Sequence, residues 1–476
     1  MSTKNPWWLY CLGFVLLFSL HIFLLLSLRF TAWPEMLAYP YLINKGFHFY
    51  GDIIHPFVPL LVVTLSLIFR LWGNTLEVLK AFTIIVILIS DGLLVWVVNK
   101  LFKKIRYTLF GLALYIILQI CFEGNGMWFD LAVAPLLICS FLTAVNWFGE
   151  NKKIWAIATG ILFAIALLVK LSTIWIVGAV LFLALGTRRK YIWSFLTSVL
   201  FFSFTILLFL VRIFDLGNWQ NIFYWGFIYP LFIVIRMPGY FSPPSLGQAV
   251  FSMGILVPLC LILIITSIKL RNTTVYLALI FFFGAVFFGL HRFGYFHFQP
   301  ALPFFVIGLL AYLKFFRPLI KQKKRSYQTV LIGLSLSLIL LLFVRTVITD
   351  WDKDTRFAEG SVLEETSEIS SIIPFGEEVF FYNVPSQYFA LSDLLPPAPW
   401  ADTFPWYLEL PGIQERVVAS LEEKKITYIL FDPFIPGSTY TLGSYKPQII
   451  DAYIGQHYKE NRIIGKNKRL LKRIDI

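Results

Sequence analysis

The chain has 476 residues, of which 58% are apolar and 14% charged, and its mean hydropathy is +0.75. This composition excludes a soluble globular protein and predicts a polytopic α-helical membrane protein. Residues 1–349 hold 27 basic and 8 acidic residues, whereas residues 350–476 hold 13 basic and 19 acidic ones, for a net charge of +13. Such a basic balance is typical of cytoplasmic loops and not of nucleic-acid binding. The sequence therefore predicts a transmembrane domain over 1–349 and a soluble domain over 350–476, called the tail below.

Apolar runs follow one another along the first domain. A full crossing needs roughly 20 residues, so several of the runs are short. The first run has Lys4 before it and no small-residue cleavage site after it, which predicts a retained anchor with a cytoplasmic N-terminus. The runs lie near 8–28, 55–72, 76–98, 107–122, 131–148, 154–169, 172–186, 191–211, 249–268, 274–290, 299–316 and 327–348.

The run at 55–72 decides the topology, because it sets the side on which every later loop lies. If it dips into the membrane and returns, about eleven helices cross and 18 of the 27 basic residues are cytoplasmic. If it crosses, only 8 of the 27 are cytoplasmic. Since cytoplasmic loops carry an excess of Lys and Arg, the first topology is preferred.

Eleven crossings place the tail outside the cytoplasm. The tail has no cysteine, and Cys11, Cys121, Cys139 and Cys260 lie in apolar stretches, which fits a bacterial cytoplasmic membrane and gives no disulfide framework. Short strands are predicted at 380–382 and 426–430, with a helix at 414–425 before the second. The tail is therefore expected to be a small extracytoplasmic α/β domain.

In this topology most acids of the first domain gather at the outer face, and only Asp91 and Glu150 lie toward the cytoplasm. Carboxylates at membrane depth are costly unless they are paired or hydrated, so they are functional candidates. Glu77 and Asp215 are expected to be solvated loop acids. The other outer acids are Glu35, Asp52, Glu123 and Asp130.

The first outer segment, residues 30–75, has a distinctive order of features. Glu35 follows the first apolar run, a short helical stretch ends at Gly46, and a Tyr50-Gly51-Asp52 turn precedes a proline-led apolar run. This order resembles the first outer loop of GT-C membrane glycosyltransferases, closest to the family 39-like group, which includes protein O-mannosyltransferases and the lipid A aminoarabinose transferase.

Later features extend the resemblance over roughly residues 8–320. A basic loop at 100–106 precedes the acidic segment 123–130, the run 160–169 ends in Lys170-Leu171-Ser172-Thr173, and Tyr295–Pro303 resembles the start of a late helix of the family. One position departs from the pattern, because the family's first loop usually carries Asp-Glu where this chain has Pro34-Glu35. That departure leaves Asp52 as the competitor of Glu35.

The resemblance implies transfer of a sugar, with inversion, from a polyprenyl-phosphate donor to an envelope acceptor, which is a lipid, a glycan or a protein, at the outer face. Glu35 would accept the proton of the acceptor hydroxyl, with Asp52 as second choice; either could instead be an interface acid or a helix cap. Asp130, aided by Glu123, would orient the acceptor or bind Mg²⁺ or Mn²⁺, or is a solvated loop acid.

Several basic residues are predicted to lie at the outer face, although Lys and Arg are usually concentrated in cytoplasmic loops. Lys and Arg side chains stabilise the negative charge that develops on a leaving phosphate. Lys170 lies at the outer turn between two short helices. His55, His291 and His297 could contact phosphate or a metal, but they lack ligand spacing and are expected to be polar packing residues. The phosphate candidates are Lys170, Arg212, Arg236 and Arg292, of which the last two could equally reach the interface by snorkelling.

Two other functions remain open at this point. A transporter or flippase for lipid-linked saccharides would also use many helices and an intramembrane lysine, although no inverted repeat is visible. A non-enzymatic envelope assembly protein would use its tail to bind a partner. No Gly-x-x-x-x-Gly-Lys-Ser/Thr loop occurs, which favours a lipid-linked donor over a nucleotide.

Overall fold

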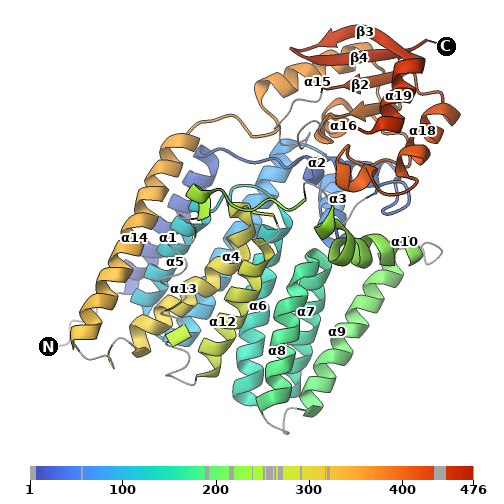
Figure 1. Cartoon of the computed structure of the whole chain (residues 1–476). Helices are drawn as coiled ribbons and strands as arrows, with labels where there is room; N and C mark the ends of the chain where they lie inside the picture. Colours follow the sequence, from blue (N-terminus) through green and yellow to red (C-terminus); the bar gives the residue numbers. More distant parts are fainter. Residues whose placement is uncertain are drawn as a thin grey trace. The chain divides into compact units, whose positions relative to one another are not determined.

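The computed structural model describes residues 7–54, 57–187, 192–213, 219–237, 240–249, 272–289, 292–316, 322–433 and 446–474, with isolated positions at 252, 261, 264–265 and 318. Its residues divide into two compact units, each discontinuous in sequence. The helical unit comprises residues 1–30, 81–212 and 243–353, and the mixed unit comprises 31–80, 213–242 and 354–476. Figure 1 shows the elements of both.

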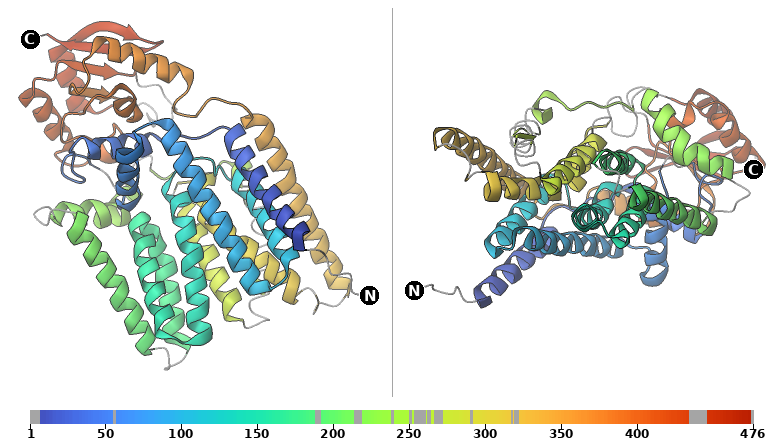
Figure 2. Two further views of the ribbon diagram at one scale, coloured as in Figure 1. Left: turned by 180° about the vertical axis from the view of Figure 1, so that it is seen from behind. Right: turned by 90° about the horizontal axis from the view of Figure 1, so that it is seen from below.

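The helical unit consists of long apolar helices that run side by side (Figures 1 and 2). The apolar runs of the sequence coincide with these helices, with two exceptions: the run at 55–72 belongs to the mixed unit, and the run at 249–268 lies largely outside the described residues. The helices are α1 (Trp7–Ser27), most of α4 (Leu76–Phe102), α5 (Ile105–Cys121), α6 (Phe129–Glu150), α7 (Lys153–Val169), α8 (Ile174–Thr187), α9 (Ile192–Ile213), α12 (Thr273–Val286), α13 (Leu302–Ala311) and α14 (Gln322–Asp350), with the short helical segments η1 (Leu171–Thr173) and η7 (Tyr295–Ala301) between them.

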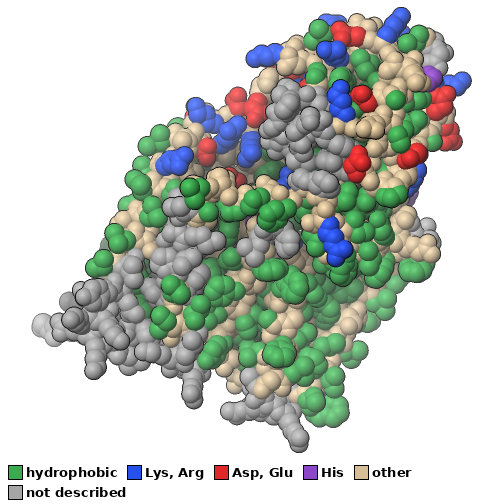
Figure 3. Space-filling view, in the orientation of Figure 1, with side chains coloured by type: hydrophobic (Ala, Val, Ile, Leu, Met, Phe, Trp, Pro, Cys, Tyr) green, Lys and Arg blue, Asp and Glu red, His purple; other side chains and the backbone are tan. Residues whose placement is uncertain are grey.

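Six described helical segments are long and apolar enough to cross a membrane: Trp8–Ser27, Leu76–Phe102, Phe129–Glu150, Ile192–Val211, Tyr295–Phe315 and Ile332–Asp350. Large apolar side chains are exposed along α9, including Leu200, Phe204 and Leu207, and apolar side chains cover much of the visible surface over the helices in Figure 3. Such a surface suits lipid and not water. The predicted class, a polytopic α-helical membrane protein with a small C-terminal sheet, is confirmed.

The two ends of the helical unit differ in character. Asn125 donates to the carbonyls of Leu25 and Leu28, each at 3.0 Å, so the turn before α6 lies beside the end of α1. We call this the Asp130 end, where α1, α5 and α7 end and α6 begins. At the opposite, basic end, Lys100 at the end of α4 donates to Asn146 near the end of α6, at 3.1 Å. The basic end also carries Lys103, Lys104, Arg106, Lys152, Lys153 and Lys314.

This geometry bears on the segment 55–72. The chain leaves α1 at the Asp130 end and runs through α4 to the basic end, so residues 28–75 start and finish at the same end of the unit. The helix formed by this run, α3 (Leu60–Trp72), has 13 residues, fewer than the roughly 20 that a crossing needs. The dip-and-return topology fits both observations. Which end faces the cytoplasm stays a prediction.

The mixed unit contains a four-stranded sheet in the order β1-β2-β4-β3. Strand β1 (Val379–Tyr382) is buried along its whole length and pairs in parallel with β2 (Tyr428–Phe431), while β4 (Lys468–Arg473) pairs antiparallel with β2 and with β3 (Tyr458–Ile464). The predicted strands and the predicted helix correspond to β1, β2 and α18 (Ile413–Glu423). The remaining helical elements are α2 (Pro34–Asn44), α3, α10 (Trp219–Phe223), η4 (Tyr224–Ile233), η5 (Val234–Arg236), α15 (Gly360–Ile372), α16 (Gln387–Ser392), α17 (Pro405–Leu408) and α19 (Gln448–His457).

Candidate functional site

The first cluster of interest surrounds Asp130 in the helical unit. Asp130 lies in the first turn of α6, where the positive end of the helix dipole favours an acid, and its side chain is fully buried. Lys170, the residue that ends α7, donates to one carboxylate oxygen, and Nδ1 of His297 lies 2.9 Å from the other. Three segments from distant parts of the sequence thus bring a carboxylate, an ammonium and an imidazole together.

The cluster keeps limited access to its surroundings. The side chains of Lys170 and His297 are 15% and 13% exposed, so both are mostly but not wholly buried. An ammonium has three N–H donors, and Asp130 takes one of them. The exposed part of the Lys170 side chain is where a second anion could reach it.

Side-chain amides fix the turn that leads into Asp130. Gln119 donates to the carbonyl of Gly124 at 2.7 Å, and Gln299 donates to the carbonyls of Gln119 and Phe122 at 3.0 and 2.6 Å. Gly124 must be a glycine here, because a Cβ atom would lie 2.3 Å from the amide nitrogen of Gln119. These bonds satisfy carbonyls left open at the end of α5 and tie the turn to η7, which carries His297.

A second buried polar pair lies deeper in the helical unit. Nδ1 of His21 is 2.7 Å from Asp91, Nε2 is 3.2 Å from Oε1 of Gln119, and His21, Asp91 and Gln119 are all fully buried. Because Gln119 donates its amide to Gly124, its oxygen must face His21, so Nε2 of His21 carries a hydrogen. The 2.7 Å contact then shares one proton, and the His21–Asp91 pair is neutral overall in either form.

The sequence analysis placed Asp91 toward the cytoplasm and gave His21 no role. Asp91 instead lies in the middle of α4, where His21 and, through it, Gln119 connect it to the turn at the Asp130 end. His297 was expected to be a packing residue, and its bond to Asp130 was missed. His21, Asp91 and His297 are each a polar residue within an apolar run, and this was the signal available in the sequence.

The mixed unit holds Glu35 in a different setting. Glu35 is half-buried in the first turn of α2, and Tyr39, one turn later, donates to Asp402 of the tail at 2.8 Å. Burial raises the pKa of Asp402 to about 6, against the opposing effect of the Tyr39 hydrogen bond. Burial is the main cause that raises the pKa of both Tyr39 and Tyr407. The charges of Asp402 and Glu35 contribute to both shifts, so the two acids act on the same phenols. The sequence analysis missed Asp402.

Aromatic residues of the 219–242 segment join this region of the mixed unit. The Tyr229 hydroxyl donates to the Trp406 carbonyl, and the Tyr240 ring lies 5.8 Å from the Trp406 ring. Trp406 is in turn stacked on Phe404, at 4.5 Å. The region therefore combines two acids with rings and phenols, which are groups that recognise hydroxylated ligands.

Asp52 has a local structural partner. Its carboxylate accepts from the backbone N–H of His48 at 2.8 Å and lies 3.0 Å from the His48 ring, within the turn that Tyr50 occupies with a positive φ of 63°. Its backbone carbonyl accepts from Trp400 at 2.8 Å. Asp52 thus has a structural role in its own turn, and Glu35 stays the first predicted candidate for the base.

Of the other predicted site residues, Arg292 lies near the cluster, because its charge acts on His297. Arg292 is half-buried in the helical unit, while Glu123 and Arg236 are exposed, in the helical and the mixed unit respectively. His55, His291 and the side chain of Arg212 lie outside the described part of the chain. The structure thus brings together Asp130, Lys170 and His297, and separately Glu35, Tyr39 and Asp402.

The described residues do not suit a metal ion. Nowhere among them do three His, Cys, Asp or Glu side chains group so that they could hold one. Asp130, the predicted ligand, already has one oxygen on Lys170 and the other on His297. Within the cluster only Asp130 and His297 are groups that commonly bind metals, and no metal-dependent role is assigned to it.

No protein-family model matches the sequence, and no curated protein matches it either. Solved structures do match. ArnT from Cupriavidus metallidurans, bound to undecaprenyl phosphate, is 11% identical with a TM-score of 0.61, over 97% of this chain and 98% of that one. An oligosaccharyltransferase from Archaeoglobus fulgidus, tethered to an acceptor peptide, is 13% identical with a TM-score of 0.55, over 97% of this chain and 73% of that one.

The arabinofuranosyltransferase AftD from Mycobacteria also matches, at 11% identity and a TM-score of 0.51, over 96% of this chain and 39% of that one. These proteins are GT-C membrane glycosyltransferases. The likeness confirms the predicted GT-C resemblance at the level of the fold, and it extends beyond residues 8–320 to nearly the whole chain. At 11–13% identity it concerns the fold and not the activity.

Proposed function

We propose that this protein is a membrane glycosyltransferase that moves a sugar from a polyprenyl-phosphate donor to an envelope acceptor, with inversion. The observation that carries the proposal is the buried Asp130–Lys170–His297 cluster, within a fold that matches ArnT bound to undecaprenyl phosphate over 97% of the chain. A lipid phosphate requires a cation close to the membrane surface, and Lys170 at the end of α7 supplies one.

Lys170 and Asp130 have complementary roles in this proposal. The ammonium of Lys170 stabilises the negative charge that develops on the leaving phosphate. Asp130 neutralises Lys170 before the donor arrives and fixes the direction of its N–H groups. His297 holds the second oxygen of Asp130, so the carboxylate keeps its orientation when the phosphate binds.

Glu35 is the proton acceptor in this proposal. A carboxylate in the first turn of α2, half-buried, can accept the proton of the acceptor hydroxyl within about 3 Å in the bound complex. Asp52 is the second candidate, although its carboxylate supports its own turn. No cofactor is assigned.

The proposed location is a bacterial cytoplasmic membrane, with the N-terminus in the cytoplasm and the tail, residues 350–476, outside it. Support comes from the gathering of basic residues at the basic end, which the positive-inside rule places in the cytoplasm. The tail leaves α14 at the opposite end, since the N–H of Asp352 donates to the Ser27 carbonyl at 2.9 Å.

The test is sugar transfer in proteoliposomes. Purified protein is given a panel of polyprenyl-phosphate hexoses and pentoses together with envelope lipids, glycans or peptides, and released polyprenyl phosphate is measured. We expect release that depends on an acceptor and that Glu35→Gln and Lys170→Met reduce, whereas Glu415→Gln, on the exposed face of α18, does not. Movement of the donor across the bilayer without product would favour a flippase and overturn the proposal.

A further inference from the structure

The helix that carries Glu35 is poorly suited to hold its own position. Helix α2 has 11 residues, whereas isolated helices shorter than about 12–15 residues are marginal in water. Its N-cap, Trp33, makes no side-chain capping bond, and Pro40 interrupts the interior hydrogen bonding. The placement of Glu35 therefore depends on contacts from outside α2.

Those contacts come from a short stretch of the tail, within the mixed unit. Tyr39 donates to Asp402 at 2.8 Å and Tyr41 donates to Asp393 at 2.7 Å, although more than 350 residues separate the partners. Lys45, just after α2, is 2.7 Å from Asp393. The stretch 393–402 thus holds the second half of α2 and the residue that follows it.

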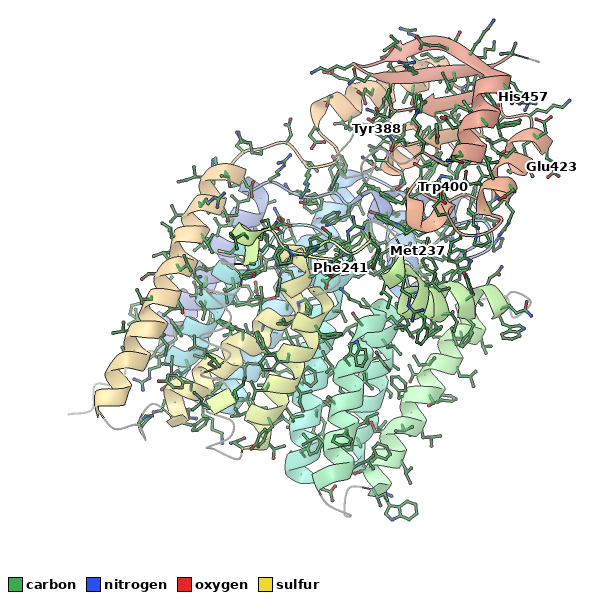
Figure 4. All side chains as sticks on the ribbon, viewed as in Figure 1. Met237, Phe241, Tyr388, Trp400, Glu423 and His457 are labelled. Carbon is green, nitrogen blue, oxygen red and sulfur yellow. The ribbon has the colours of Figure 1, made fainter. Side chains whose placement is uncertain are left out.

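The same stretch also holds the chain after α2. Trp400, labelled in Figure 4, donates its backbone N–H to the Asp52 carbonyl and accepts from the Ile54 N–H, each at 2.8 Å. The Trp400 ring also lies 6.1 Å from the Tyr39 ring. Backbone and side-chain contacts therefore fix the first outer loop to the tail on both sides of its turn.

Asp402 differs from Asp393 in what balances its charge. Hydrogen bonds from Lys45 and Tyr41 outweigh partial burial and lower the pKa of Asp393. Asp402 is buried, and no basic side chain among the described residues forms an ion pair with it. A buried carboxylate without a cation lowers stability, so its presence points to a role other than stability.

We propose that Asp402 is a positioning residue for Glu35: it holds Tyr39 and thereby the first turn of α2, which makes the tail a working part of the transferase. Tyr39 stands one helical turn after Glu35, so the two side chains leave α2 on the same face. Loss of the Tyr39–Asp402 bond removes the buried polar contact one turn after Glu35, and Glu35 then samples orientations in which proton transfer fails. This inference rests on the proposed role of Glu35.

A double-mutant cycle tests the proposal on the full-length protein. Asp402→Ala and Tyr39→Phe each remove the bond, and we expect each to lower kcat at least tenfold, with less than a twofold change in the KM for donor. Because both act through one bond, the double variant should lose no more than either single one. Asp402→Asn keeps an acceptor for Tyr39 and should retain most of kcat, and the exposed tail acid Asp354, changed to Asn, serves as the matched control.

Hydrogen exchange of the α2 amides supplies a readout that does not need activity. Asp402→Ala should speed exchange over residues 34–44, while the sheet amides of 379–382 keep their rates. If Asp402→Ala leaves the exchange rates of α2 unchanged, the proposal that Asp402 holds α2 is wrong. This result does not depend on activity, so it applies even if the wild-type protein transfers no sugar and the proposed function has failed. Faster exchange with an unchanged kcat overturns the positioning role, and additive losses in the double variant overturn the route through Tyr39.

Discussion

Lys170 and Asp130, 40 residues apart in the sequence, form an ion pair inside the helical unit. Lys170 therefore has two roles: it is the proposed phosphate ligand, and it also neutralises a fully buried carboxylate. A substitution at either position therefore changes stability and activity together, and single variants cannot separate the two.

Lys170→Met should raise the apparent requirement for lipid donor more than tenfold, a loss above about 1.4 kcal/mol. It should also lower the stability of the protein by roughly 3–5 kcal/mol, because Asp130 then carries a buried charge without its cation. Lys170→Arg should recover part of both, since charge matters more than shape for a point contact with phosphate. Transfer kinetics and thermal unfolding in detergent measure the two effects.

The double variant Asp130→Asn/Lys170→Met separates the two roles of Lys170. Removing both charges should return the unfolding midpoint close to that of the wild type, while donor binding stays weak. Donor binding that recovers with stability would mean that Lys170 is only a structural partner. The phosphate ligand would then be Arg212, Arg236 or Arg292.

Glu35→Gln should reduce transfer by roughly 10²–10⁴-fold, because it removes proton acceptance without changing the size of the side chain. Asp52→Asn keeps an acceptor oxygen for the His48 N–H and should have a much smaller effect. Single-turnover rates with saturating donor compare the two. A larger loss for Asp52→Asn than for Glu35→Gln would show that the base has been assigned to the wrong carboxylate.

Most of the helices and two of the four tail strands, β1 and β2, could be predicted, because runs of apolar side chains leave direct traces in the sequence. The pairing of Asp130 with Lys170 could not, although both residues were singled out. Hydropathy gives the length of a helix but not which helix ends meet. Asp402 was hidden for another reason: the tail holds 19 acids, and nothing in their local sequence distinguishes the buried one.

The neutral pair of His21 and Asp91 should behave as a unit in stability measurements. His21→Leu leaves Asp91 buried without its partner and should lower the free energy of unfolding by roughly 3–5 kcal/mol. The double variant His21→Leu/Asp91→Leu removes the uncompensated carboxylate and should lose less stability than His21→Leu alone, while Oε1 of Gln119 still lacks its donor. Thermal unfolding in detergent measures the cycle. Losses that add in the double variant would mean that the two residues do not share a proton.

Cysteine labelling tests the predicted sides of the membrane. In a background without the four native cysteines, a membrane-impermeant reagent should label Glu423→Cys, at the exposed end of α18 in Figure 4, in intact cells. Lys104→Cys, exposed at the basic end, should react only after the cells are opened. The reverse labelling pattern would invert the proposed topology.

Asp402 should make stability depend on pH. Its pKa is about 6 in the folded chain, whereas an aspartate in an unfolded chain titrates near 4. Between these values the folded state binds more protons than the unfolded state, so the contribution of Asp402 to the free energy of unfolding falls as pH rises from about 4 to about 6. A difference of about two units between the folded and unfolded pKa corresponds to roughly 3 kcal/mol of unfolding free energy as an upper value.

Asp402→Asn removes this dependence, so its unfolding midpoint should match that of the wild type near pH 4 and exceed it at pH 7. Equal midpoints at both pH values would show that Asp402 is not buried as a charge, and its positioning role would lose the observation that set it apart from Asp393.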